Sequence, residues 1–448
     1  MQRLYSFLIL SIFCVFSTFA ASNIYLSHGW NSTQTGVYNF TALHTYYLSP
    51  TGSDAANGLT TATAWASPNH AVQCGDVIIA QPGNYTPAYS PFGSGSWGTV
   101  STCPSTSGGI DGNGGVYFAT LLCGGTDVMS CNIQNSLSGE PFRVDKSNWA
   151  VEGFYAKNAL ASTCFSAVSS TTTTIHHVAF INDIGIGCQL AAIDTYSYQA
   201  TASCGLLCGG VDQTAIVGAI AFNAASGSSV CGSGISIIPF PGPDTSAGTH
   251  VYLSGVYSYN NVNGFCGSRS NGAGGYTTAY AAASPGATSF QVTSTTNLSV
   301  GHPIGDLGNS AYNTGVSGNG ALSAGSVVNT ITGSSSPYTI TFLNAAGGTG
   351  VVASPGIASG DNIAYGGTTD GEGIIFDTWG SNNGSGVGYP YQGVVEQSVL
   401  WNNGSSGFEV FCNGTCNSTV SVIVKGISTY NNNQDWKRQE LGLFDNLY

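Results

Sequence analysis

The sequence is poor in charged residues, and this shortage limits the partners it can bind. Its 448 residues include 8 Lys and Arg against 21 Asp and Glu, so 6% are charged, where a soluble domain has about a quarter. The formal net charge is −13. A phosphate backbone is bound by clustered Lys and Arg, and an anionic membrane surface by basic segments. Neither pattern is present, which argues against nucleic acid and against a membrane surface as partners.

Long apolar runs are also scarce. One run, Leu4 to Phe19, follows the single charge of Arg3 and precedes Ala20. This pattern predicts a secretory signal peptide over residues 1–20, with an uncleaved anchor as the alternative. No other stretch is long and apolar enough to cross a membrane. We therefore expect a secreted protein that is extracellular, periplasmic or attached to the cell surface.

Methionine is limited to two residues, but cysteine is not scarce. Of the 13 cysteines, Cys14 lies in the signal segment, which leaves 12. An even number in an exported chain predicts up to six disulfides, with the pairing left open. The closely spaced pairs Cys204 and Cys208, and Cys412 and Cys416, have no His or second Cys pair at zinc-finger spacing nearby. We expect them to form disulfide loops rather than zinc sites.

A loose internal repeat indicates the architecture. Apolar residues make up 42% of the chain, enough to bury a core, and small polar residues are abundant. Several segments share a short apolar strand, a polar turn, a second short strand and an Asn pair; the clearest are 251–261, 394–403 and 422–432, with weaker copies at 149–158 and 177–183. Asn tolerates left-handed backbone, and its amide can stack on the Asn of the next coil. This pattern favours a solenoid over a β-sandwich, the alternative.

The N-terminal part carries a family resemblance. The segments YYLSPTGSD (46–54) and CGDVIIAQPGNY (74–85) flank Asn57-Gly58 and Ala64-Trp65. This order resembles the opening of secreted right-handed parallel β-helix proteins of the pectate-lyase-like superfamily. The resemblance implies an all-β fold, a right-handed parallel β-helix, with a cap near residue 46. Within the cap we expect a short helix over 68–73 and a strand that ends at Pro82-Gly83.

One segment interrupts the repeat. Residues 277–362 contain only two charges, Asp306 and Asp361, and several alternating stretches. We expect a small β-domain inserted between coils, the alternative being a long irregular excursion. The expected organisation is a signal peptide (1–20), a lead-in (21–45), the cap and first coils (46–276), the inserted β-module (277–362) and the last coils (363–448). At about 25 residues per coil, eight to ten coils are expected.

The densest polar cluster follows the inserted module. Asp370, Glu372 and Asp377 lie within eight residues of one another. Paired carboxylates can act as acid and base in glycoside hydrolysis. Clustered carboxylates can instead hold Ca²⁺, the one cofactor we consider, for β-elimination from a uronate. The third alternative is structural, with each carboxylate capping a turn.

The remaining candidate residues are a base and sugar-stacking rings. Lyases of the resembled superfamily use Lys or Arg as the base, and Arg269 follows the Asn pair of one repeat. Aromatic rings near the acidic cluster could stack on sugars; they are Trp379, Tyr389, Tyr391 and Trp401. The motifs of polygalacturonases, the main pectate lyases and pectin methylesterases are absent. The leading hypothesis is a monomeric protein that cleaves a polysaccharide as a lyase or glycoside hydrolase. The alternative is a non-catalytic glycan-binding surface protein or adhesin.

Overall fold

The computed structural model describes just over half of the chain. The described residues are 42–85, 97–103, 117–125, 127, 129–134, 140–157, 159, 163–169, 173–188, 190–196, 209–224, 233–240, 249–261, 275–296, 298–301, 304–306, 321–322, 326–344, 347–365, 371–377, 389–404, 406–411, 422–430 and 432. The signal and lead-in segments expected at residues 1–41 lie outside them.

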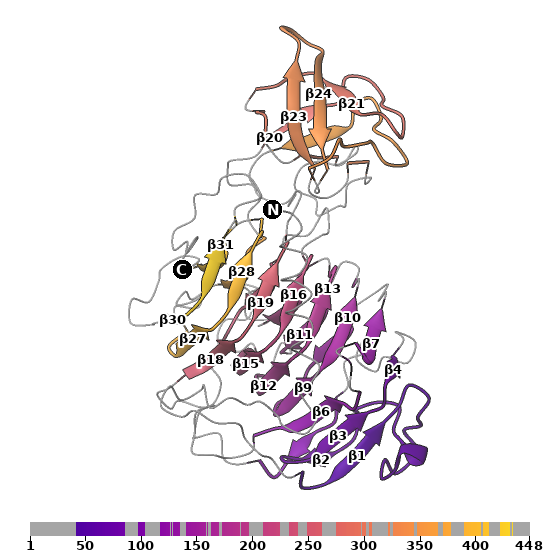
Figure 1. Ribbon diagram of the computed structural model, residues 1–448, viewed down its shortest axis with the longest axis vertical. Coiled ribbons are helices and arrows are strands. Elements are labelled where there is room, and N and C mark those ends of the chain that lie inside the picture. The colour runs from indigo at the N-terminus through magenta and orange to yellow at the C-terminus, as the bar shows by residue number, and fades with distance from the viewer. Residues whose placement is uncertain are drawn as a thin grey trace, which may run out of the picture.

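Three long parallel sheets form the body of the molecule (Figure 1). Sheet I contains, in spatial order, β1 (Thr45–Leu48), β3 (Val77–Ala80), β6 (Ala119–Cys123), β9 (Trp149–Glu152), β12 (Ile175–Ile181), β15 (Val211–Val217), β18 (Thr249–Ser254), β27 (Gln392–Glu396) and β30 (Val422–Lys425). Sheet II contains β4 (Gly83–Asn84), β7 (Cys131–Gln134), β10 (Phe154–Lys157), β13 (Ile184–Ile186), β16 (Ile220–Phe222), β19 (Tyr257–Tyr259), β28 (Val399–Trp401) and β31 (Ser428–Tyr430). Sheet III contains β8 (Phe142–Val144), β11 (Phe165–Val168), β14 (Ile193–Tyr196), β17 (Ile235–Ile237), β26 (Ile374–Phe376) and β29 (Phe408–Val410).

From β6 to β29, the chain visits the three sheets in a fixed order, one strand each per coil. Each strand pairs in parallel with the corresponding strands of the coils before and after it, as β12 does with β9 and β15. Side chains alternate between the two faces of each strand. Those facing inward, such as Val151, Phe180 and Leu253, form one continuous buried core. The expected all-β fold, a parallel β-helix, is therefore confirmed, and the nine described strands of sheet I agree with the eight to ten coils expected.

A single residue turns the chain from sheet I to sheet II in most coils. This residue has a positive φ in each of six successive coils: Gly153, Asn182, Gly218, Gly255, Gln397 and Gly426. Gly and Asn adopt this left-handed conformation at the lowest cost, which explains their excess at this position. In one of the weaker copies of the expected repeat, the asparagine occupies a different place in the coil. Asn182 belongs to this turn, whereas the paired asparagines of the clearer copies follow sheet II.

The expected asparagine ladder follows sheet II. Asn261 Nδ2 donates to Asn403 Oδ1, and Asn403 Nδ2 donates to Asn432 Oδ1, both at 2.9 Å. Asn261 and Asn403 are fully buried. The preceding residues Asn260 and Asn402 have φ of 54° and 53°. The first Asn of each pair thus bends the chain, and the second bonds to the neighbouring coil.

The N-terminal cap contains β1, β3 and a short pairing of β2 (Val72–Gln73) with β5 (Val100–Ser101). The strand expected before Pro82 is confirmed as β3. The short helix expected over 68–73 is wrong, because this segment bends and then forms β2. Asp54 stabilises the bend: its carboxylate accepts hydrogen bonds from the backbone of Ala66 and from both the backbone and the hydroxyl of Ser67.

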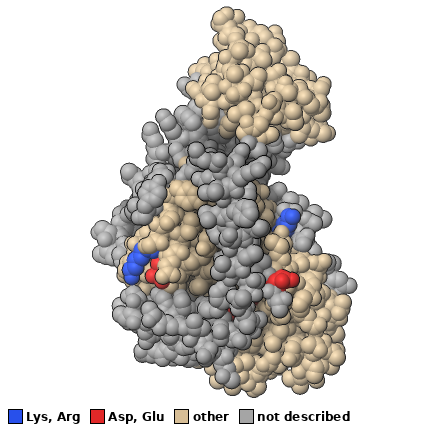
Figure 2. Space-filling view, in the orientation of Figure 1, with Lys and Arg blue, Asp and Glu red and all other residues tan. Residues whose placement is uncertain are grey.

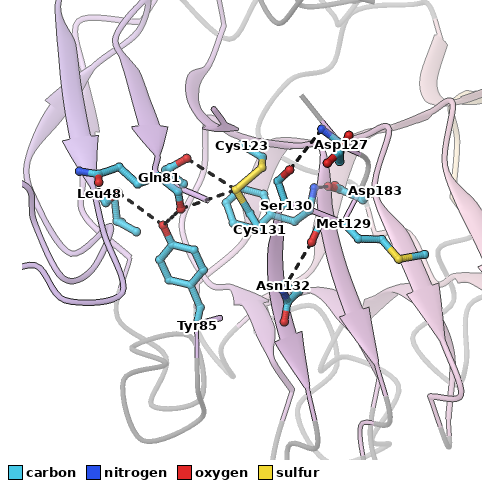
Figure 3. The surroundings of a disulfide bond; sticks show 12 residues. Leu48, Gln81, Tyr85, Cys123, Asp127, Met129, Ser130, Cys131, Asn132 and Asp183 are labelled. Carbon is cyan, nitrogen blue, oxygen red and sulfur yellow. Dashed lines mark hydrogen bonds between the residues drawn. A yellow bond between two sulfur atoms is a disulfide. The ribbon is translucent and has the colours of Figure 1, made fainter. Parts of the chain in front are cut away.

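Three disulfides are present among the described residues: Cys74–Cys103, Cys123–Cys131 and Cys164–Cys188. Cys123 ends β6 and Cys131 begins β7, so this bond closes a longer connection where later coils use one left-handed residue (Figure 3). Closing a loop of this length stabilises a fold by about 2–3 kcal/mol in the chain-entropy model. The remaining cysteines, including those at 204, 208, 412 and 416, lie outside the described residues.

Two antiparallel sheets are inserted within one coil, between its sheet II strand β19 and its sheet III strand β26. One sheet has the order β20 (Gly275–Thr278), β25 (Asn362–Tyr365), β22 (Ile304–Asp306), and the other β21 (Ser289–Val292), β24 (Tyr338–Leu343), β23 (Val327–Thr332). Phe290, Ile340 and Phe342 are buried in a core distinct from that of the solenoid. The solenoid continues in register across this insertion, because β18 pairs with β27 and β19 with β28.

Charged side chains are sparse on the face seen in Figure 2. Within the described part of the chain, no helix is long and apolar enough to cross a membrane.

Candidate active site on sheet III

The outward face of sheet III carries an unusual share of the polar side chains. The middle residue of each strand points away from the core, and cross-coil pairing aligns these residues in one row: Arg143, Ser166, Asp194, Ser236, Ile375 and Glu409. A second set lies two residues before each strand and includes Glu140, Thr163, Ser233, Glu372 and Ser406. Both sets therefore stack along the solenoid axis.

Ser and Thr hydroxyl groups donate hydrogen bonds to carboxylates of this face. Thr163 Oγ1 donates to Asp194 Oδ2 at 2.9 Å, and the Ser166 hydroxyl donates to Asp194 Oδ1. Thr163 and Ser166 flank the start of β11, so they reach Asp194 from the preceding coil. Burying a carboxylate is costly unless it is hydrogen-bonded. The sequence therefore provides two donors for the one carboxylate of β14.

Glu140, Arg143 and Asp194 form a compact charged group at the N-terminal end of this face. Arg143 Nε lies 3.6 Å from Glu140 Oε2. The side chains of Arg143 and Glu140 are 38% and 19% exposed, whereas Asp194 is buried. A partly accessible carboxyl, a deeply buried carboxyl and a guanidinium thus lie together, which is a combination that can transfer protons to and from a bound molecule.

The surroundings make both carboxyls weaker acids than usual. Burial, reinforced by the nearby Glu140 carboxylate, raises the pKa of Asp194 to about 7, although Ser166 and Thr163 act in the opposite direction. Burial also raises the pKa of Glu140, and Arg143 opposes this rise. A carboxyl that stays protonated near neutral pH can act as a general acid. Asp194 has this property.

The acidic cluster predicted from the sequence is only partly described. Asp370, Arg269 and Trp379 lie outside the described residues. Glu372 is fully buried, and its Oε2 accepts a hydrogen bond from Ser233 at 2.6 Å. Asp377 lies on the other side of β26, where its backbone N–H bonds to the carbonyl of Ile237. Glu372 and Asp377 therefore flank one strand, and Glu372 does not face an open groove.

The Ca²⁺ site expected at Asp370, Glu372 and Asp377 stays a prediction, because Asp370 lies outside the described residues. Gly373 and the three residues of β26 separate Glu372 from Asp377, which is about 16 Å of extended chain. Ca²⁺ takes six to eight oxygen ligands that surround one point. Among the described residues, no group of three His, Cys, Asp or Glu is arranged to hold a metal ion. We derive no step through a metal.

The predicted sugar-binding rings occupy two different places. Tyr389 is buried, and its hydroxyl donates to Asp212 Oδ1 at 2.6 Å. Tyr391 stacks on His250 with 3.7 Å between ring centroids. Trp401 lies on sheet II, where it stacks on Tyr259 at 4.1 Å. None of the three lies on sheet III, so the structure does not bring them together with the carboxyls.

Sequence reasoning missed the Glu140 group, although a signal was present. Four of the seven residues from 140 to 146 are charged, in a chain where 6% of residues are. Asp194 gave no such signal, because it is isolated in sequence. Only the stacking of coils places it near Glu140.

Comparisons with known proteins add the following. No family model and no curated protein matches this chain. Among solved structures, it is similar to a crystal structure of the pectate lyase Pel9A, with 13% identity over 88% of this chain and 70% of that one, at a TM-score of 0.37. It is also similar to a rhamnogalacturonan lyase, with 12% identity over 89% of each chain, at a TM-score of 0.26. The parallel β-helix itself is established by the three sheets.

Proposed function

We propose that this chain is a secreted protein that cleaves a polysaccharide, with Glu140 and Asp194 as its catalytic carboxyls. The observation that supports this is the pairing on sheet III of a buried, weakly acidic carboxyl with a partly exposed one beside Arg143. Asp194 donates a proton to the leaving oxygen, and Glu140 accepts a proton from the attacking water. The three disulfides are consistent with secretion.

The two carboxyls come from coils that are not adjacent. Glu140 precedes β8 and Asp194 lies in β14, two coils further on. Coils are about 4.8 Å apart, which places the two backbones roughly 10 Å apart along the axis. The separation of the carboxyl groups themselves decides the outcome: about 6.5–9.5 Å gives inversion, and about 5 Å gives retention. Arg143 would then neutralise Glu140 or orient a polar substituent of the sugar.

The first prediction concerns the two carboxyls. Purified protein is incubated with neutral and uronate polysaccharides at acidic and neutral pH, with Ca²⁺ or chelator, while reducing ends and ultraviolet absorbance are followed. We expect reducing ends without absorbance, and an activity that falls above pH 7 as Asp194 ionises. Asp194→Asn and Glu140→Gln should each lower the rate by at least 100-fold, the usual contribution of a general acid or base.

Glu372→Gln provides the matched control. Glu372 is an acid on the same face, in the coil of β26, but it is bonded to Ser233 and not to the Glu140 group. It should keep the activity of the parent protein. Thermal unfolding curves first establish that both variants are folded. If Glu372→Gln is then inactive while Glu140→Gln is active, the active site belongs to the cluster around Asp377. Absorbance that requires Ca²⁺ would instead show a lyase.

A second candidate function, non-catalytic glycan binding or adhesion, is favoured by an aromatic ladder on sheet II. Phe222, Tyr259, Trp401 and Tyr430 stack in order, with ring centroids 4.6, 4.1 and 6.0 Å apart. Stacked rings cover one another's faces, but Tyr430 ends the described ladder and is 41% exposed. Glycan binding by folded protein without any cleavage would support this alternative.

A further inference from the structure

Two acidic side chains meet at one turn between sheets I and II. Glu152 ends β9, and Asp183 precedes β13 in the next coil. Their exposures are 7% and 0%. Asp183 Oδ1 accepts the backbone N–H of Phe154 at 2.8 Å, which ties the turn of one coil to the strand of the coil before it. The side chain of Asn182 is hydrogen-bonded to Glu152.

Each carboxyl keeps one oxygen without a partner. Within the described residues, Glu152 Oε2 and Asp183 Oδ2 are buried and accept no hydrogen bond. An unpaired buried carboxylate costs several kcal/mol, and two that repel each other cost more. A Ca²⁺ ion would need six to eight oxygens, and two unpaired carboxyl oxygens do not supply them. Protonation removes the negative charge that makes each buried oxygen costly.

The groups around the pair supply no positive charge. Glu152 is the one charged group that acts on Asp183 in the described part of the chain. The neighbouring elements β6 and β7 present the Cys123–Cys131 disulfide, which lies against Gly153. Asp127 and Asp183 both lie in the surroundings of this disulfide (Figure 3), and Asp127 is exposed. The phenol of Tyr155 is neutral below pH 10, because burial raises its pKa.

We propose that Glu152 and Asp183 form a proton-dependent lock on this turn. With both carboxyls protonated, the turn is closed and Asp183 holds the Phe154 N–H. When both carboxyls ionise, their repulsion opens the turn and weakens the contact between the two coils. The lock is independent of the sugar-cleaving site on sheet III and regulates the stability of the solenoid, not its chemistry.

The direction of the pH effect follows from the acidities. Burial raises the pKa of Glu152 to about 8, partly opposed by Asn182, and raises the pKa of Asp183 well above its ordinary value. In the unfolded chain both carboxyls ionise near pH 4. The folded state therefore binds more protons between about pH 4 and 8, so stability falls as pH rises through this window. The stabilisation is complete in acid and lost at alkaline pH.

Thermal unfolding between pH 4 and 9 tests the lock. The parent protein should lose stability as pH rises, and Glu152→Gln should lose markedly less, because its amide cannot ionise. Glu396→Gln is the matched control: Glu396 occupies the corresponding position before the turn in a later coil and accepts the Tyr252 hydroxyl. Its melting curve should follow the parent at every pH. Superimposable pH curves for the parent and Glu152→Gln would overturn the proposal.

A second measurement keeps the test decisive if Glu152→Gln does not fold. Hydrogen exchange of the Phe154 amide in the parent protein reports directly on its bond to Asp183. Protection should collapse between pH 7 and 9, while the amide of Val256, bonded to the neutral Ser398, stays protected after correction for intrinsic exchange. Equal protection losses at both amides would contradict the lock. Neither measurement depends on catalysis, so failure of the proposed polysaccharide cleavage would leave the result intact.

Discussion

Asparagine illustrates how a residue type acquires two separate roles in this chain. Asn260 and Asn402 bend the backbone, and Asn261 and Asn403 hold neighbouring coils together. A side-chain amide carries both donors and an acceptor, so identical amides stacked one coil apart can pair with each other along the axis. The paired asparagines of the sequence predict this arrangement, because both roles are needed at each bend.

Removing one member of the ladder should destabilise the fold. Asn403 Nδ2 donates to Asn432 Oδ1 and the Ser258 carbonyl, and its Oδ1 accepts from Asn261 Nδ2. Asn403→Ala removes these three buried hydrogen bonds, at a cost of about 3 kcal/mol. Asn84→Ala, at an exposed position of β4, is the control and should change stability by less than about 0.5 kcal/mol. Chemical denaturation measures the free energy of unfolding of both variants. Equal losses in the two variants would show that the asparagine ladder does not stabilise the fold.

At the same scale, the candidate site shows where sequence reasoning stops. Glu372 is conspicuous in sequence because it lies near Asp377, yet the fold buries it against Ser233. Asp194 is inconspicuous, but coil stacking brings it within reach of Glu140. In a solenoid, residues that are close in sequence need not share a site. A side chain instead lies beside the residue at the corresponding position of the next coil.

At the scale of the element, the turn between sheets I and II has one strict requirement. Its central residue has φ between 51° and 77° in all six coils from Gly153 to Gly426. This regularity allows strands of successive coils to keep the same register. The repeat scheme predicts a turn here, but the left-handed residue is hidden from the sequence because Gly, Asn and Gln all occupy it.

Gly255 tests this requirement. A side chain at Gly255 would meet no atom closer than 3.8 Å, so space is not limiting. Gly255→Val should cost about 2 kcal/mol through left-handed strain alone, because a β-branched residue tolerates this conformation poorly. Gly255→Asn should be close to neutral, since Asn182 adopts the same conformation in an earlier coil. Thermal melting of the two variants compares them; equal destabilisation would show that the strain argument is wrong.

At the scale of the whole molecule, the insertion interrupts the sequence of the solenoid but not its structure. Strands β17, β18 and β19 pair with β26, β27 and β28 in parallel register. A contact also crosses the insertion: the Tyr389 hydroxyl donates to Asp212 Oδ1 at 2.6 Å, the same oxygen that His250 Nδ1 contacts at 2.9 Å. The composition of residues 277–362 predicted a separate β-module, while these long-range contacts require the folded chain.

The solenoid should therefore survive loss of the insertion. The inserted sheets have their own core around Phe290 and Phe342, apart from the core that contains Phe376 and Phe408. Replacing residues 275–365 by a short Gly-Ser linker adds little loop-closure entropy, since this grows only with the logarithm of loop length. We expect the melting temperature of the solenoid to stay within a few degrees of the parent. A variant that no longer melts cooperatively would show that the insertion holds the last coils in place, and that the pairing of β18 with β27 depends on it.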